Sequence, residues 1–213
     1  ELHYIKKERF LQNKPSTMYP TAYRVQYFHD ATHGPHSKAS VVLRMSFDTT
    51  VMHVSPANPL GTFYYQLSAL EEFHPHICVG DSYGAMALYH IMQKKMYDGN
   101  SLLLWLPLSY FPNGINLPAS GKHILVFSTA SVTEADIIRT LKPIAGELQQ
   151  EEKGSHKVFT KGNVTAYLID ASMVDDFLQF PGSGKEGLVL KDLVDTLCDA
   201  DLKFSKAQDK GVL

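Results

Sequence analysis

The feature of this sequence that most constrains its fold is a strand, a glycine turn and a helix that follow one another directly between His76 and Lys94. The stretch reads HICVGDSYGAMALYHIMQK. Ile77–Val79 is apolar and predicts a buried strand, Gly80 and Gly84 bracket the turn, and a helix is expected to begin at once. Proteins use such a junction in two main ways. It can hold a phosphate on the helix N-terminus, or it can present a serine nucleophile on a strained elbow.

The rest of the chain alternates apolar strands with stretches of helical periodicity, which predicts an α/β fold with a mostly parallel sheet. A buried parallel strand is expected in the continuous apolar run at 101–108. Pro143 is expected to kink or split the helix that Thr133 caps. Further strands are expected at 123–127 and 163–170, and helices at 61–73, 134–150 and 188–204.

The N-terminal part has a different composition. Residues 1–20 are polar and predict an arm, and the β-rich stretches 23–28 and 40–47 flank a Gly/Pro turn, which predicts a β-hairpin. The sequence SPANPL then breaks the pattern. We therefore expect an N-terminal arm and β-hairpin over 1–55 and an α/β domain over 56–213, with the last strand cut short at its C-terminus.

Composition limits the possible partners. The 213 residues carry 20 Lys and Arg against 22 Asp and Glu, a net charge of −2, so there is no global electrostatic case for nucleic-acid binding. No apolar run reaches the about 18 residues that span a bilayer, and we expect no membrane contact. Cys78 and Cys198 do not form a disulfide framework, and a reducing compartment is expected.

A phosphate-binding junction needs a second element, usually a strand that ends in an aspartate and holds the magnesium shell. The sequence YLID, which ends at Asp170, has that form. On this interpretation the candidate nucleotide-binding residues are Gly80, Asp81, Ser82, Tyr83, Gly84, Ala85 and Asp170.

From about Thr62 to its C-terminus the chain resembles the death-associated-protein-3 family, the GTP-binding component of the mitochondrial small ribosomal subunit. The resemblance rests on FYYQLSALEEF, ICVGDSYG, ALYHIMQKKM and LLLWLP, and then on AYLIDASMV and KEGLVLKDLV. It implies a P-loop-type core, a place in the mitochondrial matrix, neighbouring ribosomal proteins as partners, and limited rRNA contact through residues 1–25.

The chain departs from the P-loop pattern G-x-x-x-x-G-K-[ST]. Met86 or its neighbour stands where a lysine should reach the phosphates, and no Ser or Thr follows to bind magnesium. The resemblance therefore implies a degenerate nucleotide site, with no cofactor or weakly bound GTP with Mg²⁺, in a protein that acts as a structural ribosomal component and not as an enzyme. The Gly-Lys pair in 181–186 is expected to lie in a surface loop.

The second interpretation is a serine hydrolase of the α/β-hydrolase type, because GDSYG matches G-x-S-x-G with Ser82 at the elbow. The acid would be Glu134 or Asp136. The base would be His156, in an unusual position, because the triad order places the histidine after the last strand and no histidine follows His156. Such a hydrolase could be active or inactive.

Two further expectations complete the prediction. The protein could instead be a subunit of another large mitochondrial assembly. The histidines 29, 33 and 36 lie in a Gly/Pro turn, and we expect them in a solvated loop and no metal site there.

Overall fold

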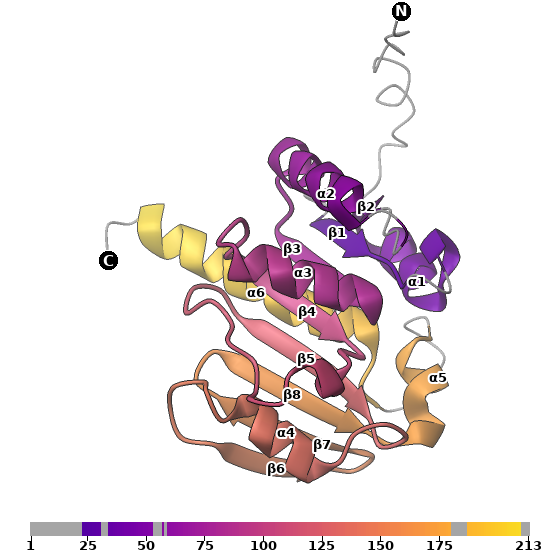
Figure 1. The fold of residues 1–213 in the computed structure, drawn as a ribbon, viewed down its shortest axis with the longest axis vertical. Helices are drawn as coiled ribbons and strands as arrows, with labels where there is room; N and C mark the ends of the chain where they lie inside the picture. The colour runs from indigo at the N-terminus through magenta and orange to yellow at the C-terminus, as the bar shows by residue number, and fades with distance from the viewer. Residues whose placement is uncertain (1–22, 31–33, 53–56, 58, 180–186, 210–213) are drawn as a thin grey trace, which may run out of the picture.

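The computed structural model describes residues 23–30, 34–52, 57, 59–179 and 187–209, which fold around an eight-stranded sheet (Figure 1). The strand order is β2-β1-β3-β4-β5-β8-β7-β6. Strands from β2 to β8 in this order run parallel, and β7 and β6 are antiparallel at one edge. The predicted α/β fold with a mostly parallel sheet is confirmed. The strands are β1 (Arg24–Phe28), β2 (Asp48–Met52), β3 (Ile77–Asp81), β4 (Asn100–Leu104), β5 (His123–Ser128), β6 (Gln149–Lys153), β7 (His156–Lys161) and β8 (Val164–Ile169).

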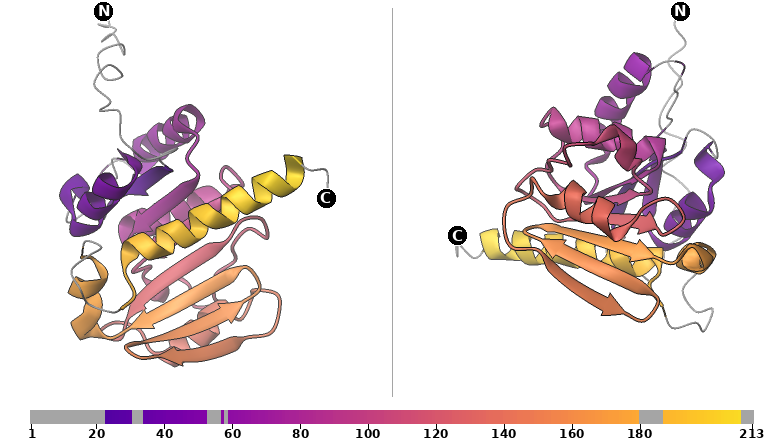
Figure 2. Two further views of the ribbon diagram at one scale, coloured as in Figure 1. Left: turned by 180° about the vertical axis from the view of Figure 1, so that it is seen from behind. Right: turned by 60° about the horizontal axis from the view of Figure 1, so that its bottom comes forward.

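Helices cover both faces of this sheet. Helices α2 (Pro59–Phe73), α3 (Tyr83–Gln93) and α4 (Glu134–Leu141) pack on one face. Helices α1 (Lys38–Ser46) and α6 (Leu190–Asp209) pack on the other, where α6 crosses behind the sheet in Figure 1 and in front of it in the reverse view of Figure 2. Short helical turns make up the remaining elements: η2 (Gly34–His36), η3 (Leu108–Tyr110), η4 (Ala171–Met173) and α5 (Val174–Phe177).

The predicted N-terminal hairpin is wrong, because residues 40–47 lie mostly in helix α1 and not in a strand. Ser37 caps this helix by accepting a hydrogen bond from the Ser40 backbone N–H. Ala39, Val42 and Leu43 then fall on one buried face at helical spacing, which outweighs the β propensity of the valines. Helix α1 is thus the crossover between two parallel strands, β1 and β2, and β1 pairs directly with β3 in the same sheet.

The helix predicted over 134–150 is shorter than expected. Its N-terminus is confirmed: Thr133 and Asp136 form a reciprocal capping box. The helix ends at Leu141, before Pro143, and the chain then forms the hairpin of β6 and β7. Every residue of β6 is exposed, so this strand lacks the apolar alternation that would have revealed it.

The direction of strand order reverses between β1 and β3. From β1 the chain moves outward to β2, and from β3 it moves the other way to β4 and β5. In open α/β sheets, ligands bind outside the carboxyl ends of the strands at such a switch point. The ends of β1 and β3, at Phe28 and Asp81, therefore mark the expected position of a site.

Two glycines let helix α3 approach the sheet closely at this switch point. A Cβ on Gly84 would lie 2.0 Å from the Phe28 carbonyl oxygen, and one on Gly80 would lie 2.6 Å from the Ala85 Cα. Both obstructing atoms belong to the backbone and cannot rotate away. The first turn of α3 thus sits directly on the ends of β1 and β3.

Replacing Gly84 by Ala should therefore lower the free energy of unfolding by at least ~2 kcal/mol, because the helix must shift off the end of β1. Urea denaturation measures the change. Gly187→Ala is the matched control, since no atom lies within 4 Å of its added Cβ. Equal stability of the two variants would contradict the close packing at Gly84.

A buried histidine holds the opposite, amino end of the central strands. The Nε2–H of His123 donates to the backbone carbonyls of Pro118 (3.0 Å) and Ser120 (3.1 Å), so its Nδ1 accepts from the Ser101 hydroxyl at 2.8 Å. The neutral ring satisfies all of these bonds. Burial lowers the pKa of His123 below its ordinary value.

Because the folded-state pKa of His123 is lowered, the unfolded chain binds more protons as the pH falls through about 6.5. Stability from this residue is present above that pH and is lost below it. We expect the urea midpoint to fall between pH 7.5 and 5.5, and to fall less in His123→Gln. The exposed His90 provides the control variant, His90→Gln, which should keep the wild-type dependence.

Candidate functional site

The turn between β3 and α3 consists of a single residue, Ser82. Its backbone angles are φ 51° and ψ −107°, a conformation that costs energy for any residue with a side chain. Two backbone hydrogen bonds hold it there: the Ser82 N–H donates to the Leu104 carbonyl at 2.8 Å, and the Met86 N–H donates to the Ser82 carbonyl at 3.2 Å. The structure thus presents Ser82 on a sharp strand-to-helix elbow at the carboxyl edge of the sheet.

A buried carboxylate lies beside this serine. The Ser82 hydroxyl donates to Asp81 Oδ1 at 3.0 Å, and the Tyr27 hydroxyl donates to Asp81 Oδ2 at 2.9 Å. Because the Tyr27 proton is used in that bond, the Ser37 hydroxyl is the donor in its 2.8 Å bond to Tyr27. Asp81 is 8% exposed and Tyr27 is fully buried. Burial, and then the charge of Asp81, raise the pKa of Tyr27, which keeps this hydroxyl protonated as a donor.

The end of β1 lies next to the elbow. The register pairs Phe28 with Gly80, so His29, the first residue after β1, lies beside Asp81, the last residue of β3. Both are buried, with exposed fractions of 2% and 8%. The Nδ1–H of His29 donates to the Asp30 carbonyl at 2.7 Å.

The histidines of this segment do not share one environment. His29 is buried, although the sequence predicted a solvated loop, whereas His36 is exposed in η2. His33 lies outside the described residues. Among the residues that the structure describes, no three His, Cys, Asp or Glu side chains are grouped to hold a metal ion.

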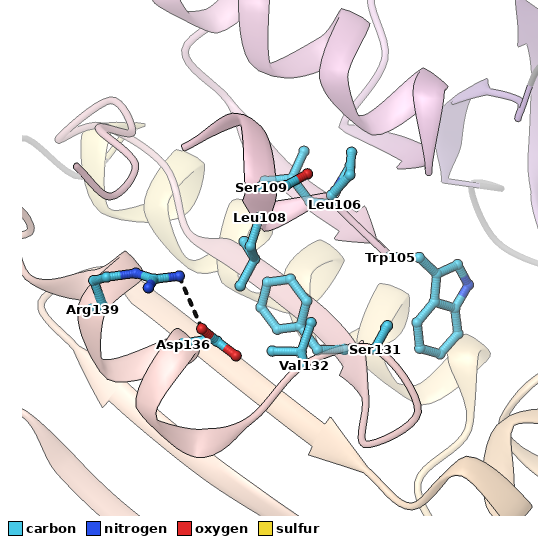
Figure 3. A pocket seen from close by; sticks show the side chains of 10 residues that line it. Trp105, Leu106, Leu108, Ser109, Ser131, Val132, Asp136 and Arg139 are labelled. Atoms are coloured by element: carbon cyan, nitrogen blue, oxygen red, sulfur yellow. Dashed lines mark hydrogen bonds and ion pairs between the residues drawn. The ribbon is translucent and has the colours of Figure 1, made fainter. Parts of the chain in front are cut away.

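A pocket of about 440 Å³ opens at the same edge of the sheet, between the segment that follows β4 and the N-terminal part of α4 (Figure 3). Its first wall residue, Trp105, has a φ of 54°, a second strained position at this edge. Asp136 and Arg139 form an ion pair of 2.9 Å on the α4 side. The lining residues are Trp105, Leu106, Pro107, Leu108, Ser109, Phe127, Ser131, Val132, Asp136 and Arg139.

The structure does not bring Ser82, Asp136 and His156 together. Asp136 accepts hydrogen bonds from the Thr133 hydroxyl and N–H, which lower its pKa, and it pairs with Arg139. The neighbouring candidate acid, Glu134, accepts from Lys157 at 2.5 Å.

His156 lies on β7, four strand positions from β3, about 19 Å at the usual spacing of strands. Its ring lies 5.8 Å from that of Tyr167, and burial, then the charge of Lys153, lower its pKa. In the described part of the chain, the Ser82 hydroxyl therefore bonds to Asp81 and not to a histidine.

The predicted nucleotide-binding residues fall into two places. Gly80 and Asp81 belong to β3, and Tyr83–Ala85 form the first turn of α3, so no extended loop separates strand from helix. Asp170 follows β8, with β4 and β5 between, about 14 Å away at ordinary strand spacing. It caps η4 by accepting from the Ser172 hydroxyl and N–H, and these bonds lower its pKa.

The resemblance to the death-associated-protein-3 family, with its weakly bound GTP and mitochondrial ribosomal partners, stays a prediction. Co-sedimentation with small ribosomal subunits and magnesium-dependent GTP binding would test it. The segment expected to contact rRNA, residues 1–25, lies almost wholly outside the described residues, as does the Gly-Lys pair of 181–186.

Sequence reasoning missed two parts of this site. Tyr27 and Ser37 come from a strand and a helix cap whose arrangement was not predicted, and no local pattern links them to Asp81. Trp105 lies in an apolar run that predicted core, and its position at a pocket follows from a strained bend that composition does not show.

Comparison with known proteins adds little. No family model and no curated protein matches the sequence. Among solved structures, a protein of Xanthomonas campestris pv. campestris, named as a hydrolase of the alpha/beta superfamily, matches with 12% identity and a TM-score of 0.47, over 73% of this chain and 91% of that one. A likeness of this size supports no functional inference. Within the described residues, no helix is both long enough and apolar enough to cross a membrane.

Removing the Tyr27 hydroxyl should destabilise the protein by about 1–3 kcal/mol, because the buried Asp81 and the half-buried Ser37 each lose a bonding partner. Urea unfolding of Tyr27→Phe measures this. Tyr110→Phe, at a residue that is 68% exposed, is the control and should unfold like the wild type. A Tyr27→Phe protein of unchanged stability would show that the hydroxyl does not hold Asp81.

Proposed function

We propose that this protein is a serine hydrolase of the α/β-hydrolase type and that Ser82 is its nucleophile for acyl transfer. The observation that carries the proposal is the strained conformation of Ser82 between two glycines that leave no room for a Cβ. A nucleophile elbow has this local form: the glycines allow close packing of strand and helix, and the serine is pushed out at the top of the sheet.

The backbone around Ser82 supports this role. Strained residues persist where the surrounding structure imposes them, and they gather at functional sites. The first N–H groups of α3, beginning with that of Tyr83, have no partner within the helix and lie at its positive end. An N–H directly after the nucleophile is one of the donors that stabilise the oxyanion in this class of enzyme.

The group that can accept the serine proton is the Asp81 carboxylate, which already accepts the Ser82 hydroxyl at 3.0 Å. In the acylation step Ser82 Oγ bonds to the acyl carbon, its proton passes to Asp81 Oδ1, and the carbonyl electrons move to the oxyanion. When the tetrahedral intermediate of an ester substrate collapses, the alcohol part of the ester leaves and takes the proton from Asp81. Water then attacks the acyl-serine by the same route and releases the acid.

The proposal is tested with a fluorophosphonate probe, which labels activated serines. We expect the wild-type protein to be labelled and Ser82→Ala to remain unlabelled. Ser68→Ala, at an exposed residue of α2, is the control and should be labelled as the wild type. If the folded wild-type protein does not react, Ser82 is not a nucleophile and the proposed activity fails.

Asp81→Asn provides a separate test of the proton acceptor. The amide fills the same space but is a far weaker base, so the labelling rate should fall by about 10²-fold or more. The comparison uses protein whose thermal unfolding matches the wild type within a few degrees. Labelling at the wild-type rate would show that a group other than Asp81 activates Ser82.

A further inference from the structure

The pocket and the elbow are joined through the backbone of β4. The Ser82 N–H donates to the carbonyl of Leu104, the last residue of β4, and the next residue, Trp105, is the first wall of the pocket. The Trp105 N–H in turn donates to Val126 of β5 at 2.9 Å. The two strained residues at this edge, Ser82 and Trp105, therefore directly follow the neighbouring strands β3 and β4.

The same apolar cluster lies beneath both features. Tyr83 and Met86, in the first turns of α3 after the elbow, pack against a buried cluster that contains the pocket residues Leu106, Phe127 and Val132. The first turns of α3 and the pocket wall thus belong to one apolar cluster. Leu106, Leu108 and Val132 lie on two sides of the pocket in Figure 3.

The charges at the pocket compensate one another. Asp136 pairs with Arg139 at 2.9 Å and also accepts the hydroxyl and N–H of Thr133. Five of the eight other lining residues are leucine, phenylalanine, valine or tryptophan, and Ser109 and Ser131 add hydroxyl groups to the wall. With no uncompensated charge on its lining, the pocket favours an uncharged apolar group over a carboxylate or a phosphate.

We propose that this pocket binds the acyl group of the substrate and that the substrate is an ester of a neutral, apolar acid. The inference rests on the proposed function of Ser82, because the ester carbon must reach that hydroxyl. A volume of about 440 Å³ lies in the range of pockets that hold small ligands. Each methylene buried in such a pocket should strengthen binding about fourfold.

Trp105 gives a direct measure of occupancy, since it is the sole tryptophan of the sequence and lines the pocket. The Ser82→Ala protein is titrated with methyl butyrate, methyl octanoate and monomethyl suberate while Trp105 emission is followed. We expect saturable binding of methyl octanoate, with at least tenfold weaker binding of both the shorter ester and the ester with a terminal carboxylate.

Two variants made in the Ser82→Ala protein locate the binding. Val132→Phe fills the pocket and should weaken methyl octanoate binding at least tenfold. Ser131→Phe narrows the pocket from an exposed position and should also weaken methyl octanoate binding. It replaces Val132→Phe as the test if that variant folds poorly. Ile138→Phe, at a residue of α4 that is 40% exposed and outside the pocket, is the matched control and should bind as the parent protein does.

Because these titrations use the Ser82→Ala protein, they do not depend on a reactive serine. Methyl octanoate binding that Val132→Phe or Ser131→Phe weakens supports the pocket as the site of the ester's apolar chain, whereas probe labelling of wild-type Ser82 separately tests the proposed hydrolase activity. A Trp105 emission that methyl octanoate does not change, equal affinity for the three esters, or binding that neither pocket variant weakens overturns the inference, whatever the reactivity of Ser82.

Discussion

The contact on which the site depends is the close approach of the first turn of α3 to the ends of β1 and β3. Gly84 packs against the Phe28 carbonyl and Gly80 packs against the backbone of Ala85, and a Cβ on either glycine would clash with these backbone atoms. With the helix held there, one residue must turn the chain from strand to helix. Ser82 is that residue, and its positive φ follows from the packing around it.

The same packing places an acidic side chain in a buried position at the carboxyl edge of the sheet. Asp81 ends β3 with its carboxylate among buried side chains, and hydroxyl donors from β1 and from the elbow satisfy it. A buried carboxylate is costly unless hydrogen bonds compensate it. Tyr27 donates to Asp81, and Ser37 donates to Tyr27, so both residues stabilise the elbow. The helix α1 that follows β1 carries Ser37 at its N-cap and thereby connects the crossover to the site.

The strands and helices that position the elbow could be predicted from the sequence, because their signals are local. The apolar runs of β3, β4 and β5, the glycines around Ser82 and the Thr133 cap all act within a few residues. Three features could not be predicted. Helix α1 carries the β-branched Val41 and Val42, the exposed β6 has no apolar alternation, and the contacts of Asp81 and Trp105 come from segments far apart in the sequence. Sequence patterns therefore located the elbow but not the groups around it.

The alternative uses of this junction differ in what surrounds the helix N-terminus. A phosphate cradle requires several loop N–H groups and a nearby acid for magnesium, whereas here the turn is one residue long and Asp170 lies beyond β4 and β5. An acyl nucleophile requires a hydroxyl, a proton acceptor and space for the acyl group. In the proposed function, the half-buried Ser82 supplies the hydroxyl, Asp81 accepts its proton, and the pocket lined by Trp105 supplies the space. The register of β3 and β4 and the bond from the Ser82 N–H to the Leu104 carbonyl hold these groups at one edge of the sheet.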